Sequence, residues 1–563
     1  MGGMMTRTSF FLVLTPLILS AFTHLFNPVG FPCLHADEGK YVRRALHVLA
    51  GLGPQDPSSR FDHGQKSTSS YDHPHFGQIL LAGLFRIIGY PSSVDPSPTI
   101  QSIEMLYMVP RILMGIFAVV DTFLIYKIVE RRYSTKTGAF IASTLFAVMP
   151  ITWLMRRIYL DSLLMPFVLS SILFAIYLKR NNDVIISDKV NYNVGNLKNS
   201  GIKNAYEKNR NIILTLISGI FLGLAIYTKV PVITMIPLVG FLIYTNSKSF
   251  KTLGIWLIPV ILVPLLWPAY ALSVGQFDEW LDGVLWQATE RSETGVTNPI
   301  RSLILCSASN VSPDLCPTGV FKSIRSVIMM DPVLVVIGLI GIAFATIRRD
   351  YLILLWVVPF FIFSYLIQWT LYFHFILVLP VFCIASALLI VDISNKIMKK
   401  NEVYQKLLSF VIISAIGLFG LTSTVLIITT NAFFVQIAHV ALAVQNIESN
   451  DHNDDTTIIT APEYSWIFKY IFNKTHALQT RDSSGIRTDK ILLMVDRSYL
   501  SVTSKDPLKI EQEDPKQVES LLNIYNSTHT IASLDYSDKT PENYPYTNVK
   551  NCPSENLQIK TNY

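Results

Sequence analysis

Residues 371–391 read LYFHFILVLPVFCIASALLIV and contain no Asp, Glu, Lys or Arg. A helix rises about 1.5 Å per residue, so an apolar run of about 20 residues can cross a hydrocarbon core of about 30 Å. Comparable apolar runs recur at residues 9–26, 106–129, 138–154, 163–178, 212–227, 230–244, 253–272, 332–347, 352–367 and 408–434. The sequence therefore predicts a polytopic α-helical membrane protein with about 11 transmembrane helices.

The composition points to the same class. Of 563 residues, 50% are hydrophobic and only 15% are charged, whereas soluble domains carry about 25% charged residues. A water-soluble chain of this length would need several domains with polar exteriors, and the charged residues are too few to cover them. The glycine, cysteine and hydrophobic contents also exclude collagenous, disulfide-rich and disordered chains.

The placement of charge predicts the orientation in the membrane. Lys and Arg gather in every second loop, at residues 131–136, 179–210, 248–251, 348–349 and 396–406. Loops rich in these residues face the cytoplasm, so we expect an integral protein of a plasma or ER-type membrane with a cytoplasmic N-terminus. Three Asn-x-Ser/Thr acceptors, Asn310, Asn473 and Asn526, then fall on the extracytoplasmic side, where glycosylation of such acceptors takes place.

Two regions are expected from these patterns. Residues 1–435 form a transmembrane domain, with a first outer loop at 27–105 that contains interfacial helices, one of them over Phe76–Tyr90, and a second outer loop at 273–331. The polar tail, 436–563, alternates β-like runs with helical patterns and predicts a small C-terminal extracytoplasmic α/β domain. The expected strands are Thr456–Thr460, Lys490–Val495 and Thr530–Leu534, and the expected helices are Glu463–Phe472 and Pro515–Tyr525.

The cysteines fit an oxidising outer side. Cys383 lies in an apolar run, and the other four fall in regions predicted to be outside. The close pair Cys306 and Cys316 leaves two alternatives open, a small disulfide-bonded loop or unpaired thiols.

Acidic residues of the first outer loop are the first candidates for chemistry. Asp37 and Glu38 follow the first apolar run by about ten residues and open an apolar-periodic stretch that would hold them at the membrane surface. Carboxylates there can serve as a general base or bind a divalent cation. Asp72 and His73, next to the stiff Pro74, could complete the same polar site.

Cationic and polar residues near the same face are the second set. Charge inside a span is costly and usually marks a partner or a polar ligand. The candidates for substrate binding are Arg111 within the second run, Arg156, Arg157 and Asp161 between the third and fourth runs, Lys229 between the fifth and sixth, and Tyr372 and His374 at the start of the tenth. Paired loop charges and snorkelling side chains are the structural alternatives.

Carboxylates and cations that meet at one leaflet suit a particular substrate. Cations can hold the phosphate of a lipid as leaving group, and a carboxylate can take the proton of an incoming hydroxyl. Nucleotide-binding motifs such as G-x-x-x-x-G-K-[ST] do not occur in the sequence. We expect membrane lipids as surroundings and no nucleic acid as a partner.

The order of several motifs resembles a known superfamily. They are Asp37-Glu38, Asp72-His73-Pro74, Pro110-Arg111-Ile112-Leu113-Met114-Gly115, Leu160-Asp161-Ser162-Leu163 and Gly223-Leu224-Ala225-Ile226-Tyr227-Thr228-Lys229. This order is similar to that of the GT-C membrane glycosyltransferases, in particular the protein O-mannosyltransferase and ArnT-like group. His75 stands where that group often has a second proline, and the tail shows no β-trefoil pattern.

The resemblance implies a GT-C fold and an inverting transfer of a hexose such as mannose. The donor would be a dolichyl- or polyprenyl-phosphate sugar and the acceptor a hydroxyl of a protein or lipid. Asp37 matches the catalytic aspartate and Glu38 its partner, Arg111 the arginine of the second span and Lys229 the lysine after the fifth. No cofactor is required, and a divalent metal held by Asp37, Glu38, Asp72 or His73 is left open.

Two other functions compete with this one. An oligosaccharyltransferase subunit shares the membrane architecture, but its Trp-Trp-Asp motif has no counterpart beyond Tyr464-Ser465-Trp466. A transporter or non-catalytic scaffold would place ionisable residues near the midplane and show internal repeats. The depth of Asp37 and Arg111 distinguishes that class from an enzyme.

Overall fold

The computed structural model describes residues 7–55, 71–90, 100–178, 197–288, 320–367, 370–398, 401–449, 456–472, 474, 476–480, 486, 488–496, 515–535 and 556–563. The predicted Cys306–Cys316 pair and the acceptors Asn310 and Asn473 lie outside these residues.

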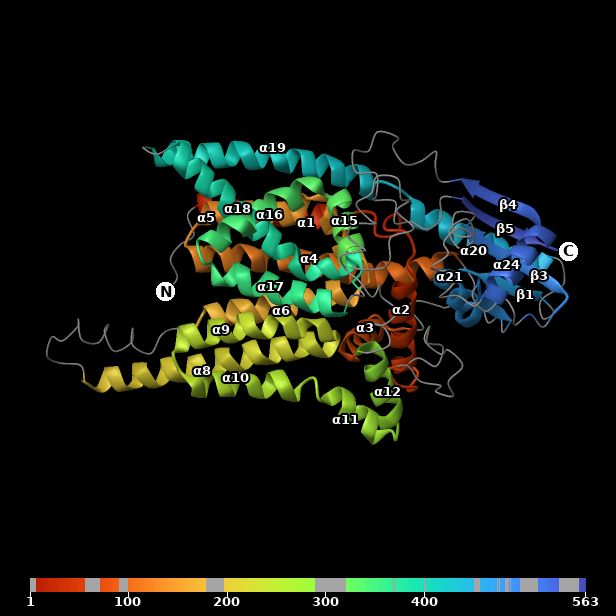
Figure 1. Ribbon diagram of the computed structural model, residues 1–563, viewed down its shortest axis with the longest axis horizontal. Helices are drawn as coiled ribbons and strands as arrows, with labels where there is room; N and C mark the ends of the chain where they lie inside the picture. The colour runs from red at the N-terminus through yellow and green to blue at the C-terminus, as the bar shows by residue number, and fades with distance from the viewer. Residues whose placement is uncertain are drawn as a thin grey trace.

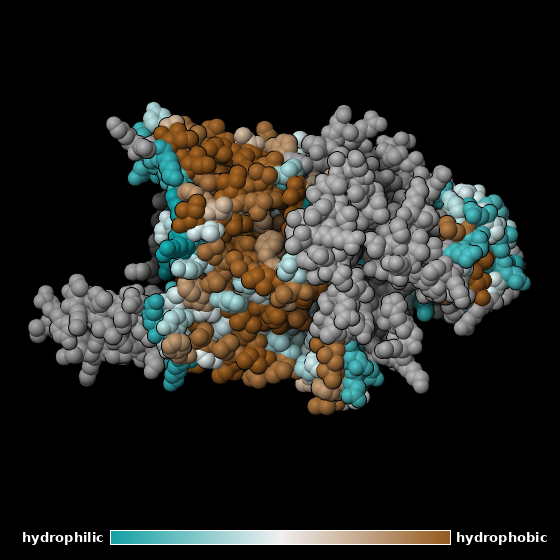
Figure 2. Space-filling view, in the orientation of Figure 1, coloured by the Kyte–Doolittle hydropathy of each residue, from teal (hydrophilic) through white to brown (hydrophobic). Residues whose placement is uncertain are grey.

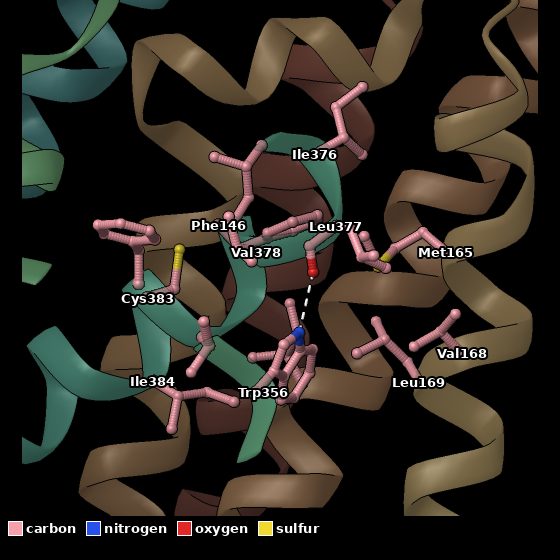
Figure 3. Packing of buried hydrophobic residues seen from close by; sticks show 14 of the residues in the cluster. Phe146, Met165, Val168, Leu169, Trp356, Ile376, Leu377, Val378, Cys383 and Ile384 are labelled. Carbon is pink, nitrogen blue, oxygen red and sulfur yellow. Dashed lines mark hydrogen bonds between the residues drawn. The ribbon is translucent and has the colours of Figure 1, made fainter. Parts of the chain in front are cut away.

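Apolar helices form a bundle that occupies most of the molecule (Figure 1). They are α1 (Arg7–Leu25), α4 (Ile100–Tyr133), α5 (Lys136–Val148), α6 (Leu160–Ile176), α8 (Leu197–Thr228), α9 (Ile236–Ser247), α10 (Phe250–Leu262), α15 (Val320–Met330), α16 (Pro332–Ile347), α17 (Tyr351–Ile367), α18 (Leu379–Ile397) and α19 (Glu402–Ile428). Their facing sides share one large apolar core. The indole of Trp356 is buried there and donates a hydrogen bond to the Leu377 carbonyl at 2.9 Å (Figure 3). The core thus satisfies even this polar group.

The length and apolar character of the helices confirm an integral membrane protein. Six helices in the described part of the chain are long and apolar enough to cross a membrane, or up to eight if each of two bent pairs counts as one span. The helices α1, α6 and α17 overlap predicted spans, but their apolar parts are too short to be counted among these six. A hydrophobic belt surrounds the bundle on the side seen in Figure 2. The count of about 11 spans stays a prediction.

Helix breaks gather polar groups at one end of the bundle. The helix α5 passes into the 3-10 turn η1 (Pro150–Arg156) with a bend of 69°, and α15 passes into α16 with a bend of 114°. Two more 3-10 turns, η2 (Val230–Met235) and η4 (Tyr372–Val378), precede α9 and α18. Proline at the start of η1, α16 and η2 fits these breaks, since it cannot donate a helical hydrogen bond. The breaks place η1, η2 and η4 next to the first outer loop.

Shorter helices cover this end of the bundle. They are α2 (Ala36–Leu49), α3 (Phe76–Ile87), α11 (Leu266–Ser273), α12 (Phe277–Ala288) and α20 (Ala432–Ser449). The helix α3 lies where the interfacial helix was expected, over Phe76–Tyr90. The predicted domain boundary at residue 436 falls inside α20.

The tail forms a five-stranded mixed sheet. Its strands are β1 (Thr456–Thr460), β2 (Ala477–Gln479), β3 (Lys490–Asp496), β4 (His529–Asp535) and β5 (Asn556–Thr561), in the order β2-β1-β3-β5-β4. The pairs of β1 with β2 and β3 are parallel, and β5 pairs antiparallel with β3 and β4. Helix α21 (Pro462–Trp466), the π-helical turn η5 (Ile467–Ile471) and α24 (Pro515–Ser527) complete it. All five elements expected in the tail are present.

The sheet and the first outer loop share one hydrophobic core. Apolar residues of α2, α3 and α4 pack with residues of α20, α21, η5 and the strands β1, β2, β3 and β5. The Trp466 indole donates to the Tyr107 hydroxyl at 3.2 Å, which joins α21 to α4. The tail therefore packs directly on the helix that carries Asp37 and Glu38 (Figure 1).

Candidate active site

The helix α2 begins with the two acidic residues singled out in the sequence. His35 caps the helix, and its ring nitrogen accepts the backbone N–H of Asp37 at 3.2 Å. Carboxylates in the first turn interact favourably with the helix dipole, which helps to explain why the helix starts here. Successive residues of a helix are about 100° apart, so Asp37 and Glu38 point in different directions.

Glu38 points into the protein, and both of its carboxylate oxygens accept hydrogen bonds. Arg111 donates to it from Nε at 3.1 Å and from Nη2 at 2.8 Å. Arg157 donates from Nη1 at 3.2 Å, and the backbone N–H of Ile158 at 3.1 Å. Burial alone would raise the pKa of Glu38, but the two guanidinium groups outweigh it and hold the pKa below its usual range. Glu38 is thus an ionised, buried link between α2, α4 and the turn before α6.

Asp37 is partly exposed at the start of α2. Its side chain is 29% exposed, whereas that of Glu38 is 0% exposed. The His35 ring lies 4.0 Å from its carboxylate. The Asp37 carboxylate also interacts electrostatically with Asp161, Tyr159 and Tyr372. Of the two adjacent acids, Asp37 is therefore the solvent-accessible one.

Tyr41 lies one helical turn beyond Asp37, among three carboxylates. Burial, together with Asp37, Asp72 and Asp161, raises the pKa of Tyr41 well above its usual value. The Tyr41 ring is 6.2 Å from that of His73. Burial lowers the pKa of His73 to about 3, so this ring is neutral at physiological pH.

Two cations of α2, Lys40 and Arg44, bind the carboxylate of Asp72. Lys40 forms an ion pair with one carboxylate oxygen of Asp72, and Arg44 Nη1 lies 2.7 Å from the other. Burial would raise the pKa of Asp72, but Arg44 and Lys40 hold it well below its usual range. The segment that carries Asp72 is in this way fixed to α2.

The turns η1, η2 and η4 supply the opposite wall. Lys229, just before η2, donates to Asp161 at 2.6 Å, and both side chains are buried. The Lys229 ammonium lies 5.2 Å from the centre of the Phe373 ring. The Tyr159 and Tyr372 hydroxyls are 3.5 Å apart.

Two of the predicted residues lie in other surroundings. Arg156 is buried and donates to the carbonyls of Phe26 and Asn27, and no carboxylate in the described part of the chain pairs with it. The His374 ring accepts the backbone N–H of Leu371 at 3.2 Å and closes the start of η4. Neither contact places the residue at Asp37.

The cluster carries an excess of positive charge. Among the described residues it combines five cations, Lys40, Arg44, Arg111, Arg157 and Lys229, with four carboxylates, Asp37, Glu38, Asp72 and Asp161. Glu38 and Asp72 each face two cations. A site with this balance, in a poorly solvated environment, favours an anionic ligand such as a phosphate.

The four metal candidates do not form a metal site in this structure. No group of three or more His, Cys, Asp or Glu side chains that could hold an ion occurs among the described residues. Two arginines surround Glu38, while a lysine and an arginine surround Asp72. Neighbouring cations oppose binding of a divalent metal to either carboxylate.

Sequence reasoning missed Lys40, Tyr41, Arg44 and Tyr159 as site residues. The spacing of Asp37, Lys40, Tyr41 and Arg44 is the signal that was available, since positions i, i+3, i+4 and i+7 share one helix face. This stretch was interpreted instead as an apolar stripe along the membrane surface.

Comparison with known proteins gives a family match over part of the chain and a similar fold. The family described as Dolichyl-phosphate-mannose-protein mannosyltransferase matches residues 58–267. No curated protein matches the sequence.

Among solved structures, the chain is similar to the archaeal oligosaccharyltransferase AglB from Archaeoglobus fulgidus. One structure of AglB, in complex with an inhibitory peptide and a dolichol-phosphate, has a TM-score of 0.52 at 12% identity, over 90% of this chain and 72% of AglB. An apo structure of the same enzyme gives 0.51 at 13% identity, over 90% and 72%. ArnT from Cupriavidus metallidurans in the apo state gives 0.48 at 10% identity, over 99% and 98%.

The AglB comparison shows that this chain shares the fold of that enzyme. Together with the family match it confirms the predicted resemblance and the prediction of a membrane glycosyltransferase. The 210 matched residues include Asp72, Arg111, Asp161 and Lys229, and Asp37 lies before them.

Proposed function

We propose that this chain transfers a hexose such as mannose from a dolichyl- or polyprenyl-phosphate donor to a hydroxyl acceptor, with inversion and with Asp37 as the base. The family match supports mannose and a dolichyl-phosphate donor. The proposal includes an extracytoplasmic active site, a cytoplasmic N-terminus and about 11 spans, as the sequence predicts.

The observation that carries the proposal is the contrast between Asp37 and Glu38. A base must reach the acceptor proton. Asp37 is 29% exposed at the helix start, whereas the Glu38 side chain is 0% exposed. Glu38, in contrast, accepts four hydrogen bonds inside the protein.

A single displacement accounts for the reaction. The acceptor oxygen forms a bond to the anomeric carbon, while the bond from that carbon to the phosphate oxygen breaks and its electron pair stays on the phosphate. The acceptor proton passes to the Asp37 carboxylate. The excess of cations over carboxylates in the cluster stabilises the leaving phosphate, and no step requires a metal.

The contacts suggest a division of roles among the cations. Lys229 and Lys40 lie on the walls near Asp37, each paired with one carboxylate of the site, and we assign the phosphate to them. Arg111 and Arg157 hold Glu38, which makes them positioning residues that fix α2. Tyr372 and Asp161 lie within range of Asp37 and can contact the sugar or acceptor.

The test uses purified protein with polyprenyl-phosphate mannose and three acceptors: a Ser/Thr peptide, an Asn-x-Thr peptide and a lipid. Products are identified by mass spectrometry. Asp37→Asn should abolish transfer, and Asp37→Glu, which keeps the carboxylate, should retain a fraction of it. Full transfer by Asp37→Asn would refute the base. Modification of the Asn-x-Thr peptide alone would support the alternative function, an oligosaccharyltransferase, which is the activity named for the structurally similar AglB.

A further inference from the structure

The hairpin of α11 and α12 carries an apolar surface outside the bundle. Leu266 and Leu272 of α11 are 53% and 67% exposed. The turn contains Gly275 at φ 73°, a conformation that favours glycine. After it, Phe277 and Leu281 of α12 are 38% and 39% exposed.

Helix α12 has three distinct faces. Trp280 and Val284 pack into the aromatic cluster with Tyr71, and Tyr71 donates to Gln276 at 2.7 Å just before the helix. Phe277 and Leu281, four residues apart, form an exposed apolar face beside it. Asp278 and Asp282, also exposed and four apart, lie about 100° further round. Apolar and acidic residues are thus separated on the exposed surface of one helix.

The apolar face continues a surface that already faces lipid. The span formed by α10 and α11 is the least buried of the candidate spans, with 28% of its apolar window inside the protein. Its exposed residues Ile258, Ile261 and Leu262 lead to Leu266 of α11. The hydrophobic residues of the hairpin lie on the side toward the belt of the bundle, and the hydrophilic ones on the opposite side (Figure 2).

Helix α12 also has the orientation that a membrane surface requires. It runs across the direction of the bundle helices, and therefore along the plane of a bilayer that the bundle crosses (Figure 1). We infer that α12 is an interfacial helix, with Phe277 and Leu281 inserted into the acyl region of the adjacent leaflet and Asp278 and Asp282 in water. This inference does not depend on the proposed reaction.

The hairpin links the membrane surface to the site. Its inner face holds Tyr71, which directly precedes Asp72. Trp267 of α11 lies 6.3 Å from the His75 ring, and Tyr270 lies 5.4 Å from it. Insertion of α12 would therefore fix the depth of the Asp72 segment relative to the lipid headgroups.

The experiment compares spin labels on two faces of α12. Leu281→Cys and Asp278→Cys are labelled with a nitroxide and reconstituted in phosphatidylcholine vesicles, with the unsubstituted protein as background. Accessibility to oxygen, which enters the bilayer, and to a water-soluble nickel chelate is measured by power saturation. The label at 281 should be several-fold more accessible to oxygen than to the chelate, and the label at 278 should show the reverse.

Two outcomes would overturn the inference. Equal access of the nickel chelate to both labels would mean that Leu281 faces water. Low access of both reagents to the label at 281 would mean that protein, a second copy or another partner, covers this face. Both substitutions are at exposed positions, and size-exclusion chromatography of each labelled protein before reconstitution checks that it is folded.

Discussion

Replacement of Glu38 by Gln distinguishes the structural role of Glu38 from the role of base proposed for Asp37. Gln has the same shape, but its amide group is a donor where the carboxylate accepts bonds from Arg111 and Arg157. Both arginines are almost completely buried, at 1% and 0% exposure. Removing the acid leaves two buried cations without their counter-charge, which costs about 3–5 kcal/mol when one partner of a buried pair is lost. That is a large share of a typical folding free energy of about 5–15 kcal/mol.

The assay is thermal unfolding in detergent, followed by transfer activity. Glu38→Gln should unfold several degrees below the unsubstituted protein and should lose activity, because α2 no longer holds Asp37 in place. Asp37→Asn is the matched control one residue away: its side chain is partly exposed, so stability should change by about 0.5 kcal/mol or less while activity is lost. An unchanged unfolding temperature for Glu38→Gln would refute the structural role assigned to this ion cluster.

Three further predictions concern neighbouring residues. Burial lowers the pKa of His75 to about 3, so between pH 6.5 and 3 the unfolded chain binds a proton that the folded protein does not. The contribution of His75 to the free energy of unfolding therefore falls as the pH drops below 6.5, by about 2 kcal/mol at pH 5. His75→Phe should remove this contribution to the pH dependence of unfolding. A Cβ on Gly39 would lie 2.1 Å from the Trp466 indole nitrogen, so Gly39→Ala should lower activity and stability. Adding Trp466→Leu should restore part of both. Unchanged activity and stability of Gly39→Ala would contradict the packing of the tail on α2. Asp121 is buried in α4, and its carboxylate oxygens have no hydrogen-bond partner in the described part of the chain. Asp121→Leu should raise the unfolding temperature, because it removes a buried uncompensated polar group. A lower unfolding temperature would show that the acid has a role beyond these contacts.

Local patterns in the sequence were sufficient for the elements and for the acidic pair. The apolar runs gave the helices of the bundle because lipid-facing and core-facing residues are both apolar, so each span is readable by itself. The strands β1, β3 and β4 follow the β-like runs closely. Asp37 and Glu38 stood out because they form an acidic pair shortly after an apolar run, a property of sequence position alone.

The partners of these residues could not be predicted in the same way. Lys40 pairs with Asp72 across 32 positions, and Glu38 with Arg157 across 119. No periodicity connects residues so far apart, since their proximity depends on how the helices pack. The resemblance supplied Arg111 and Lys229, but only the contacts show that Arg111 holds Glu38 while Lys229 holds Asp161.

Four consecutive residues explain why α2 is the centre of this arrangement. Successive positions turn by about 100°, so the four residues face different surroundings. The side chain of Asp37 is partly exposed, Glu38 contacts the arginines of the bundle, Gly39 contacts Trp466 of the tail, and Lys40 contacts Asp72. Each contact comes from a different part of the chain, and together they hold the helix from three sides. The orientation of Asp37 is therefore set by packing of the whole molecule, because α2 cannot rotate without breaking a buried ion pair and moving Gly39 against an indole.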